Sequence, residues 1–263
     1  MAYLSPQSEF SPQAYSAKVI GIAADLTQHD SAPHQHQVHQ LLYAPSGSMT
    51  ITLAQQWLIL PPTRAAWIPA GVEHRVQLHS VVAYRSLYIK ANAPLTLPTG
   101  VITVNPLLRE IIERIAFWPL DIDDSQPPIQ HLIAVLFDEL RLAPQENRHL
   151  IMPTDKRLQR FVQEITHLDN LPSLQSLADQ LYLHSKTLSR IFRKETGLAY
   201  QQWSQQWRLM RAFELLSSHT SVSLVAQQLG FSSDSAFISF FKQYTGQTPG
   251  KFLQAMVAPK LER

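Results

Sequence analysis

The sequence lacks cysteine and is poor in glycine, in charge and in long apolar runs. It has no cysteine and 8 glycines among 263 residues, and 16% of its residues are charged. The absence of cysteine excludes disulfide bonds, thiolate chemistry and zinc fingers held by cysteine. No apolar run approaches the roughly 20 residues of a membrane-spanning helix. Residues 1–10 lack the basic and apolar regions of a signal peptide. We therefore expect a cytoplasmic protein.

The few charges are distributed unevenly along a chain whose length suits two domains. Residues 154–263 carry 13 Lys and Arg against 8 Asp and Glu, whereas residues 1–153 carry 9 against 12. These surpluses of opposite sign leave the whole chain at only +2. A basic carboxyl-terminal part beside an acidic amino-terminal part is typical of a DNA-binding module joined to a different domain, because phosphates attract Lys and Arg.

Two similar helix pairs occupy residues 173–252. In the first pair, apolar residues three and four positions apart predict a short helix, a turn at 182–184 and a second helix that ends at Gly197. The same order returns about fifty residues later, with Gly230 at the turn. A duplicated pair is far more specific than a single pair. The sequence therefore predicts two helix-turn-helix units joined by a long helix over residues 199–217.

The residues that carry this pattern resemble the AraC/XylS family of bacterial transcription regulators. The matching stretches are LSRIFRKETG from Leu188, WRLMRAFELL from Trp207 and VAQQLGFSSDSAFISFFKQYTGQTP from Val225. The resemblance covers roughly the last hundred residues, and it implies a DNA-binding domain over residues 154–263. It further implies a transcription regulator, which we expect to be an activator that contacts RNA polymerase. The sequence departs from the family pattern at His184, where a capping Ser is usual, at Ser239, where Arg is common, and at Leu253, where Arg is expected.

The two recognition helices differ in the side chains that they offer to DNA. A connecting helix about 28 Å long at 1.5 Å per residue can hold them about one DNA turn, roughly 34 Å, apart. In the first, Arg190 can contact guanine through two hydrogen bonds, worth on the order of 1–3 kcal/mol of discrimination. The second has no basic side chain on its outward face, so we expect the first unit to supply most base readout. The predicted base contacts are Lys186, Ser189, Arg190, Asp234, Ser235 and Ser239, and the predicted phosphate contacts are Arg193, Lys194, Lys242 and Lys251.

The amino-terminal residues 1–104 have the pattern of short β-strands. Six segments rich in β-branched and aromatic residues, separated by Pro and Gly, lie at 38–43, 49–53, 57–60, 65–68, 75–78 and 84–89. They predict a sandwich or a small barrel. From about Asn105 the apolar period becomes helical, which predicts two helices within 105–142 that either pair two chains in a dimer or pack on the barrel. Residues 143–153 are the predicted linker, and the fold class is α+β.

A histidine-rich stretch resembles the two motifs of the cupin barrel. HQHQVHQ contains His34, His36 and Gln40 and is followed by Gly47, and PAGVEH ends at His74. In metal-binding cupins these motifs converge in the mouth of the barrel, but Gln40 replaces the usual Glu. The resemblance implies either a divalent transition metal on His34, His36 and His74 or a small effector without metal. The predicted effector-pocket residues are His34, His36, Gln40, Tyr43, Arg64, Trp67, His74 and Tyr84.

The motifs of common enzymes are absent from the sequence. There is no Gly-rich phosphate loop, nucleophile elbow or HExxH helix. A non-haem iron centre would need a carboxylate beside two histidines, which Gln40 does not supply, and strand alternation turns Glu73 away from His74. We therefore predict a regulator that is not an enzyme, that binds double-stranded DNA and a small effector, and that forms a homodimer. One alternative is a cupin-type metalloenzyme carrying a DNA-binding domain, and another is an adaptor that acts only by protein contact.

Overall fold

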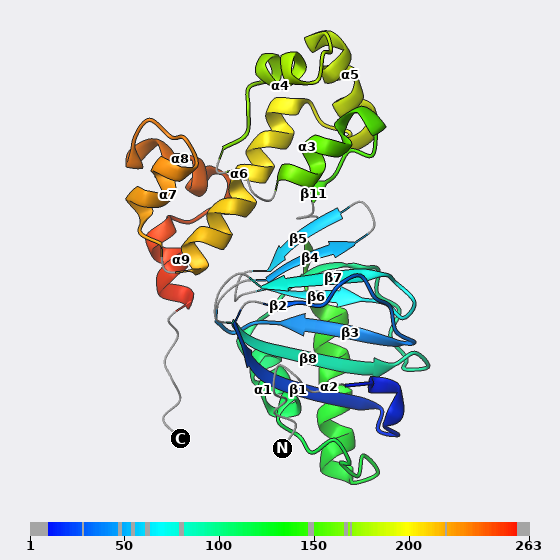
Figure 1. Cartoon of the computed structure of the whole chain (residues 1–263). Coiled ribbons are helices and arrows are strands. Elements are labelled where there is room, and N and C mark those ends of the chain that lie inside the picture. The colour runs from blue at the N-terminus through cyan, green and yellow to red at the C-terminus, as the bar shows by residue number, and fades with distance from the viewer. Residues whose placement is uncertain are drawn as a thin grey trace. The chain divides into compact units, whose positions relative to one another are not determined.

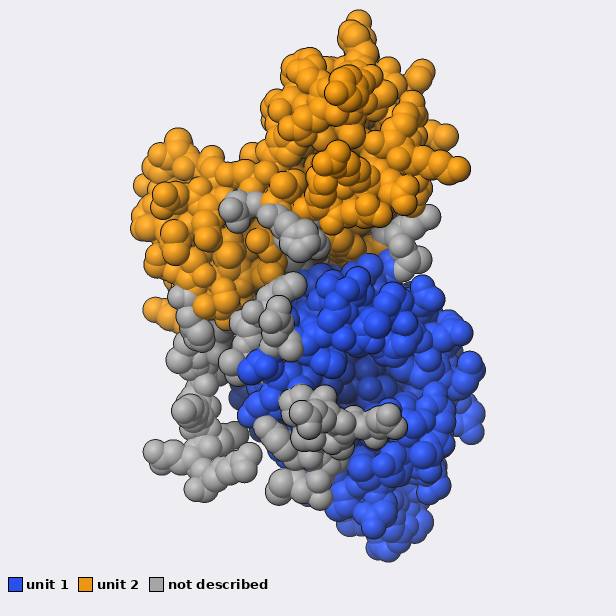
Figure 2. Space-filling view, viewed as in Figure 1, with its two compact units in different colours: residues 1–54, 58–149 blue, residues 55–57, 150–263 orange. Residues whose placement is uncertain are grey.

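A computed structural model describes residues 10–27, 29–46, 49–53, 56–60, 64–78, 82–146, 150–165, 168, 170–218 and 220–256. The chain divides into two compact units (Figure 2). Unit 1 comprises residues 1–54 and 58–149, and unit 2 comprises residues 55–57 and 150–263. Among the helices of the described part, none has the length and apolar character needed to cross a membrane.

The described strands form two sheets, which lie in unit 1 except for residues 56–57 and 150–151 of unit 2 (Figure 1). After a short helix η1 (Pro12–Ala14), the six-stranded sheet has the order β1 (Val19–Leu26), β8 (Val82–Lys90), β3 (Val38–Tyr43), β6 (Arg64–Ile68), β9 (Gly100–Thr103) and β10 (Gln145–Glu146). Its strand pairs are all antiparallel. The five-stranded sheet has the order β11 (Leu150–Ile151), β5 (Gln56–Leu60), β4 (Met49–Leu53), β7 (His74–Leu78) and β2 (His29–Asp30).

The predicted barrel is observed as two facing sheets. Over the described ranges, the hydrogen-bonded strands form two separate ladders that do not close on each other. This corresponds to the sandwich that the strand spacing also allowed. The six predicted strand segments are all present, and β3 and β4 begin and end at the predicted residues. The predicted linker contains β10 and β11, which pair with β9 and β5.

The six-stranded sheet is covered on both faces. One face packs against α1 (Pro106–Ala116) and α2 (Pro127–Leu142), with Leu41, Ile112 and Leu136 in the core between them. The other face meets the five-stranded sheet, and that core includes Leu42 and Ile51. Successive residues of one strand therefore enter different cores, because side chains alternate along a strand.

The helices of unit 2 reproduce the predicted duplication. They are η2 (Lys156–Leu158), α3 (Gln159–Glu164), α4 (Leu174–Gln180), α5 (Ser185–Thr196), α6 (Tyr200–Ser217), α7 (Val222–Gln228), α8 (Asp234–Thr245) and α9 (Pro249–Met256). The long helix α6 joins the pair α4 and α5 to the pair α7 and α8 (Figure 1). Trp203 and Trp207 of α6 are buried in the core of the first pair. Phe213 packs on Phe241 of α8, with ring centroids 5.3 Å apart.

The turns of the two helix pairs have the same backbone. Leu183 donates its amide hydrogen to Ala178 O at 2.8 Å, and Phe231 donates to Ala226 O at 2.9 Å. The preceding residue has a positive φ in both turns, 54° at Tyr182 and 71° at Gly230. Glycine adopts this conformation without steric cost, whereas a tyrosine in the same conformation is strained by its Cβ.

Replacing Tyr182 by glycine is expected to stabilise unit 2 by about 0.5–1 kcal/mol. The left-handed conformation costs a residue with a Cβ about 1–2 kcal/mol, which exceeds the entropy that glycine loses on folding. The Tyr182 side chain is 97% exposed, so little packing is lost. Urea unfolding of the full chain measures the change. Tyr182→Ala, which keeps the Cβ, should not stabilise, and equal effects of the two changes would refute the explanation.

Candidate functional site

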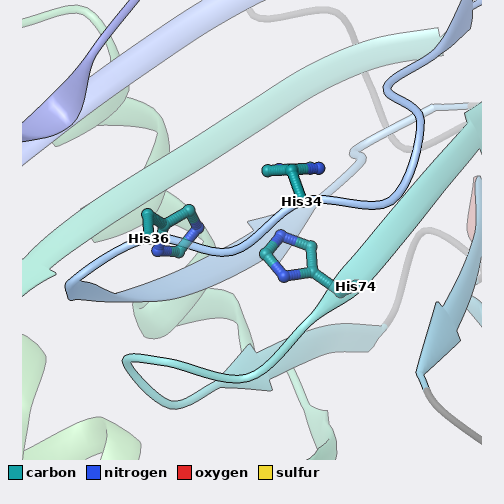
Figure 3. A group of neighbouring side chains, drawn as sticks. All are labelled: His34, His36 and His74. Atoms are coloured by element: carbon teal, nitrogen blue, oxygen red, sulfur yellow. The ribbon is translucent and has the colours of Figure 1, made fainter.

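Three histidines gather in unit 1 (Figure 3). His34 lies in the segment before β3 and forms an isolated β-bridge with His74 at the start of β7, with both amide-to-carbonyl distances at 2.9 Å. His36 follows two residues later, and its ring centroid lies 5.0 Å from that of His74. One ring nitrogen from each histidine lies within 4.8 Å of the other two. The structure thus brings together the two motifs that the sequence separates by nearly forty residues.

Each of these rings directs its Nδ1 atom at a backbone carbonyl. The contacts are His34 to Ala32 O at 3.0 Å, His36 to Val38 O at 2.7 Å and His74 to Val72 O at 2.9 Å. Because a carbonyl oxygen can only accept, each Nδ1 carries the hydrogen. In a neutral imidazole the other nitrogen, Nε2, then has a free lone pair. The same tautomer is therefore set at all three histidines.

The Nε2 atom of His74 is buried without a hydrogen-bond partner. The residue is only 1% exposed, and this burial lowers the pKa of His74 to about 4. The ring is consequently neutral at neutral pH, and its lone pair is available. Leaving a buried polar atom without a partner costs about 1–3 kcal/mol. A ligand that bonds to His74 Nε2 would remove this cost.

The loop that carries His34 is fastened to β7 through Asp30. The Arg75 guanidinium contacts both carboxylate oxygens of Asp30, and Ala32 donates its amide hydrogen to the same carboxylate at 3.0 Å. The hydrogen bond from Arg75 is the main reason that the pKa of Asp30 falls to about 2. Ala32 has a φ of 53°. The position of His34 is therefore held by contacts outside the histidine cluster.

Gln40 connects the histidines to a buried set of hydroxyl groups. Its amide lies 3.0 Å from His36 Nε2, 2.9 Å from Ser86 Oγ and 3.0 Å from Tyr88 OH. Because Nδ1 of His36 carries the hydrogen, a neutral ring pairs with Gln40 when the amide NH₂ faces Nε2. The amide oxygen then accepts from the two hydroxyls. Tyr84 shares this set, and burial raises the pKa of both Tyr84 and Tyr88.

Two predicted pocket residues lie in a different place. Tyr43 and Trp67 belong to the core under α1 and α2, not to the interior between the sheets. Trp67 donates its Nε1 hydrogen to Leu97 O at 3.1 Å, and burial raises the pKa of Tyr43. The expectation for these two side chains is therefore corrected, because the strand pattern fixes two faces but not which core each face meets. Arg64 falls on the opposite face of β6, with Ala66.

Sequence reasoning missed Ser86 and Tyr88. Both follow Tyr84 at intervals of two on β8, so strand alternation from the predicted Tyr84 would have found them. Gly47, which is part of the cupin-like pattern, lies outside the described residues. The structure thus adds two hydroxyl groups to the predicted pocket residues and moves Tyr43 and Trp67 out of the set.

In unit 2, the outer face of α5 carries the predicted first set of DNA contacts. The exposed members are Lys186, Arg190, Arg193 and Lys194, and Ser189 is half-buried. The opposite face, with Leu188 and Phe192, is fully buried. The helix begins with an unusual cap, since Nδ1 of His184 accepts from the Lys186 amide at 3.2 Å. His184 thus performs the role that Ser has in the family pattern.

The predicted contacts on α8 and α9 are also exposed, but one is engaged within unit 2. Ser235, Ser239, Lys242 and Lys251 are exposed. Asp234 accepts a hydrogen bond from Ser223 Oγ of α7. Ser233 caps α8 by accepting from the Ala236 amide at 3.2 Å. The carboxylate of Asp234 is therefore tied to the other helix of its own pair, which the sequence did not predict.

Comparisons with known proteins agree with this two-part organisation. The AraC-like ligand binding domain matches residues 16–162, and the helix-turn-helix domain matches residues 177–255. The HTH-type transcriptional regulator NimR of Escherichia coli (strain K12) is 35% identical over 241 residues, which are 90% of this chain and 88% of NimR. The arabinose operon regulatory protein of the same strain is 32% identical over 127 residues, 46% of this chain and 44% of that protein.

A solved structure also resembles unit 2. The DNA-binding domain of AdpA, a global transcriptional factor crystallised with a target DNA, shares 30% identity over 40% of this chain and 95% of its own, with a TM-score of 0.36. Two helix-turn-helix units and a ligand-binding domain define a DNA-binding transcription regulator. The chain belongs to the AraC family of these regulators. The predicted family and regulatory function are confirmed.

Proposed function

We propose that the protein reads its operator mainly through α5 and that a small molecule bound between the sheets of unit 1 controls this binding. The difference between the exposed faces of α5 and α8 is the observation that carries the first part. Lys186 and Arg190 are exposed on α5, whereas the corresponding face of α8 offers Ser235 and Ser239. A guanidinium can bind O6 and N7 of guanine together, which serine cannot do.

The remaining basic residues suit contacts to the DNA backbone. Arg193 and Lys194 lie in the last turn of α5, and Lys242 lies in the last turn of α8. Lys251 lies on α9. Contacts to phosphates fix the position of a protein on DNA without reading its sequence. We assign these four residues to phosphate binding, and we assign Asp234 to fixing α8 against α7 through Ser223.

The interior of unit 1 supports binding of a small polar effector. Gln40, Ser86 and Tyr88 form a buried hydrogen-bonded set next to His36. Such groups can exchange partners with a ligand, and an apolar surround with a few polar groups is usual for a small-molecule site. The domain that matches this part of the chain is a ligand-binding domain. We propose that the effector contacts this set and the three histidines.

We further propose that α1 and α2 join two copies of the chain in the cytoplasm. Leu107 of α1 is 52% exposed, and Val135 and Leu142 of α2 are 40% and 76% exposed. Leu107 lies among the apolar residues of the predicted helical stretch that begins near Asn105, and its exposure leaves it available to a partner. Pairing through the same surface on both chains would give two-fold symmetry. The dimer would act on RNA polymerase as an activator.

The substitution Arg190→Ala tests the proposed division of labour. Wild-type protein mixed with genomic DNA fragments should enrich one sequence motif, and Arg190→Ala should bind that motif about 5- to 150-fold more weakly, as expected for loss of about 1–3 kcal/mol. The change should also relax selectivity at one base pair. Lys194→Ala should weaken binding to all sequences alike. If Ser239→Ala weakened motif binding more than Arg190→Ala, α5 would not be the main reader.

A further inference from the structure

We propose that His34, His36 and His74 bind one divalent transition-metal ion through their Nε2 atoms. The three residues are the group of potential metal ligands found among the described residues, with one nitrogen of each within 4.8 Å of the others. They come from two separate segments that are fastened together by the bridge between His34 and His74. The site is therefore assembled by the fold and not by one flexible loop.

The hydrogen bonds of the three rings prepare the donor atoms. Each Nδ1 hydrogen is held by a backbone carbonyl. Histidines that bind metals usually donate their other ring hydrogen to a carbonyl or carboxylate, which fixes the tautomer and the orientation of the ring. At all three histidines this outer contact already exists. The nitrogen left for a metal is Nε2 in every case.

His74 supplies a second, independent indication of a ligand. Its side chain is almost fully buried, yet its Nε2 has no hydrogen-bond partner. Buried polar atoms are nearly always paired. The unpaired atom belongs to the ring that lies closest to both others, with centroids 4.3 Å from His34 and 5.0 Å from His36. A metal ion at this point would satisfy it.

The geometry and the donor type select the class of ion. Zn–N bonds of about 2.0–2.1 Å in a tetrahedral site place ligand nitrogens roughly 3.4 Å apart. One nitrogen of each ring lies within 4.8 Å of the others, so the widest spacing has to shrink by about 1.4 Å when an ion binds. Imidazole donors suit Zn²⁺, Co²⁺, Ni²⁺ and Cu²⁺, whereas Mg²⁺ and Ca²⁺ require oxygen ligands.

Gln40 sets the strength of the site. Its amide occupies His36 Nε2 at 3.0 Å, so it must turn aside when that nitrogen binds a metal. The amide oxygen is a neutral ligand at best. A glutamate at this position would place an anionic oxygen beside the same nitrogen. We therefore expect Gln40→Glu to raise metal affinity by at least about tenfold.

Direct metal titration of the tag-free full chain tests the proposal. After dialysis against a chelator, addition of Co²⁺ should give the visible absorption of a four-coordinate ion with nitrogen ligands, with saturation at one ion per chain. Calorimetric titration with ZnCl₂ should give the same stoichiometry. His34→Ala and His74→Ala should each weaken binding by at least about tenfold, as expected when a ligand is removed. His131→Ala, an exposed histidine of α2, should change nothing.

Two results would overturn the metal site. One is the absence of Co²⁺ absorption in a protein whose circular dichroism shows it to be folded. The other is an equal loss of affinity in His34→Ala and His131→Ala. His74 is buried, so its replacement can unfold unit 1. The metal affinity of His34→Ala, a change at a half-buried residue, is therefore the decisive measurement. Metal binding is measured without DNA, so it stands apart from the proposed operator binding.

Discussion

Gly21→Ala is expected to lower the free energy of unfolding of unit 1 by about 3 kcal/mol or more, at the upper end of the cost of overfilling a core. A Cβ at this position would lie 2.0 Å from Ile115 O and 2.6 Å from Ala116 Cα. Both are backbone atoms in the last turn of α1, and neither can rotate out of the way. The strand β1 and the helix α1 would have to separate, which would open the core that they share.

Urea unfolding of the full chain, followed by circular dichroism, measures this effect. Gly100→Ala is the matched control, because a Cβ at Gly100 of β9 meets nothing within 4 Å. That change should shift stability by no more than about 0.5 kcal/mol. If the two substitutions had the same effect, the loss would come from a general intolerance of side chains in these strands and not from the approach of α1 to β1.

Glu113→Ala is expected to destabilise unit 1 by about 3 kcal/mol. The Arg85 side chain is 10% exposed, and its Nε donates to Glu113 Oε2 at 3.0 Å. Its guanidinium also lies 4.9 Å from the centroid of the Phe117 ring. Removal of Glu113 would leave a buried cation without its carboxylate, a change that costs about 3–5 kcal/mol when burial is complete. We take the lower end because the Glu113 side chain is 27% exposed.

Urea unfolding distinguishes this buried pair from a surface pair. Asp138→Ala breaks the pair with Arg141 on α2, where the side chains are 68% and 44% exposed, and it should cost less than about 1 kcal/mol. The double change Arg85→Met with Glu113→Leu should recover most of the loss, because it removes both charges from the interior. A double variant as unstable as Glu113→Ala would show that the unpaired charge is not the cause.

The helices of unit 2 could be predicted because their local signals and their packing agree. Gly197 and Gly246 end α5 and α8 in the left-handed conformation, as their positions after the apolar stripes indicate. The strand β1 could not be found in this way. All but one of its residues are buried, so its sequence shows no alternation. Gly21, which would ordinarily weaken a strand, is present because α1 approaches so closely.

The sequence predicted the residues of the histidine cluster but not the hydrogen bonds that link Gln40 to neighbouring strands. Two motifs placed His34, His36 and His74 together, as the structure confirms. The hydrogen bonds of Gln40 to Ser86 and Tyr88 depend on strand pairing between β3 and β8, which no local pattern fixes. Tyr43 and Trp67 were misplaced because both faces of the six-stranded sheet are apolar. The base and phosphate contacts on α5 and α8 remain predictions.

The single amide of Gln40 has a consequence for how this receptor can evolve. Codons for glutamine and glutamate differ in their first base alone, so one nucleotide substitution replaces the amide by a carboxylate. That carboxylate would lie within reach of the Ser86 and Tyr88 hydroxyls, which can both donate to it without a change of fold. Descendants of this gene therefore have a one-step mutational route between an uncharged receptor and an anionic one, open to selection by the ligands that each habitat supplies.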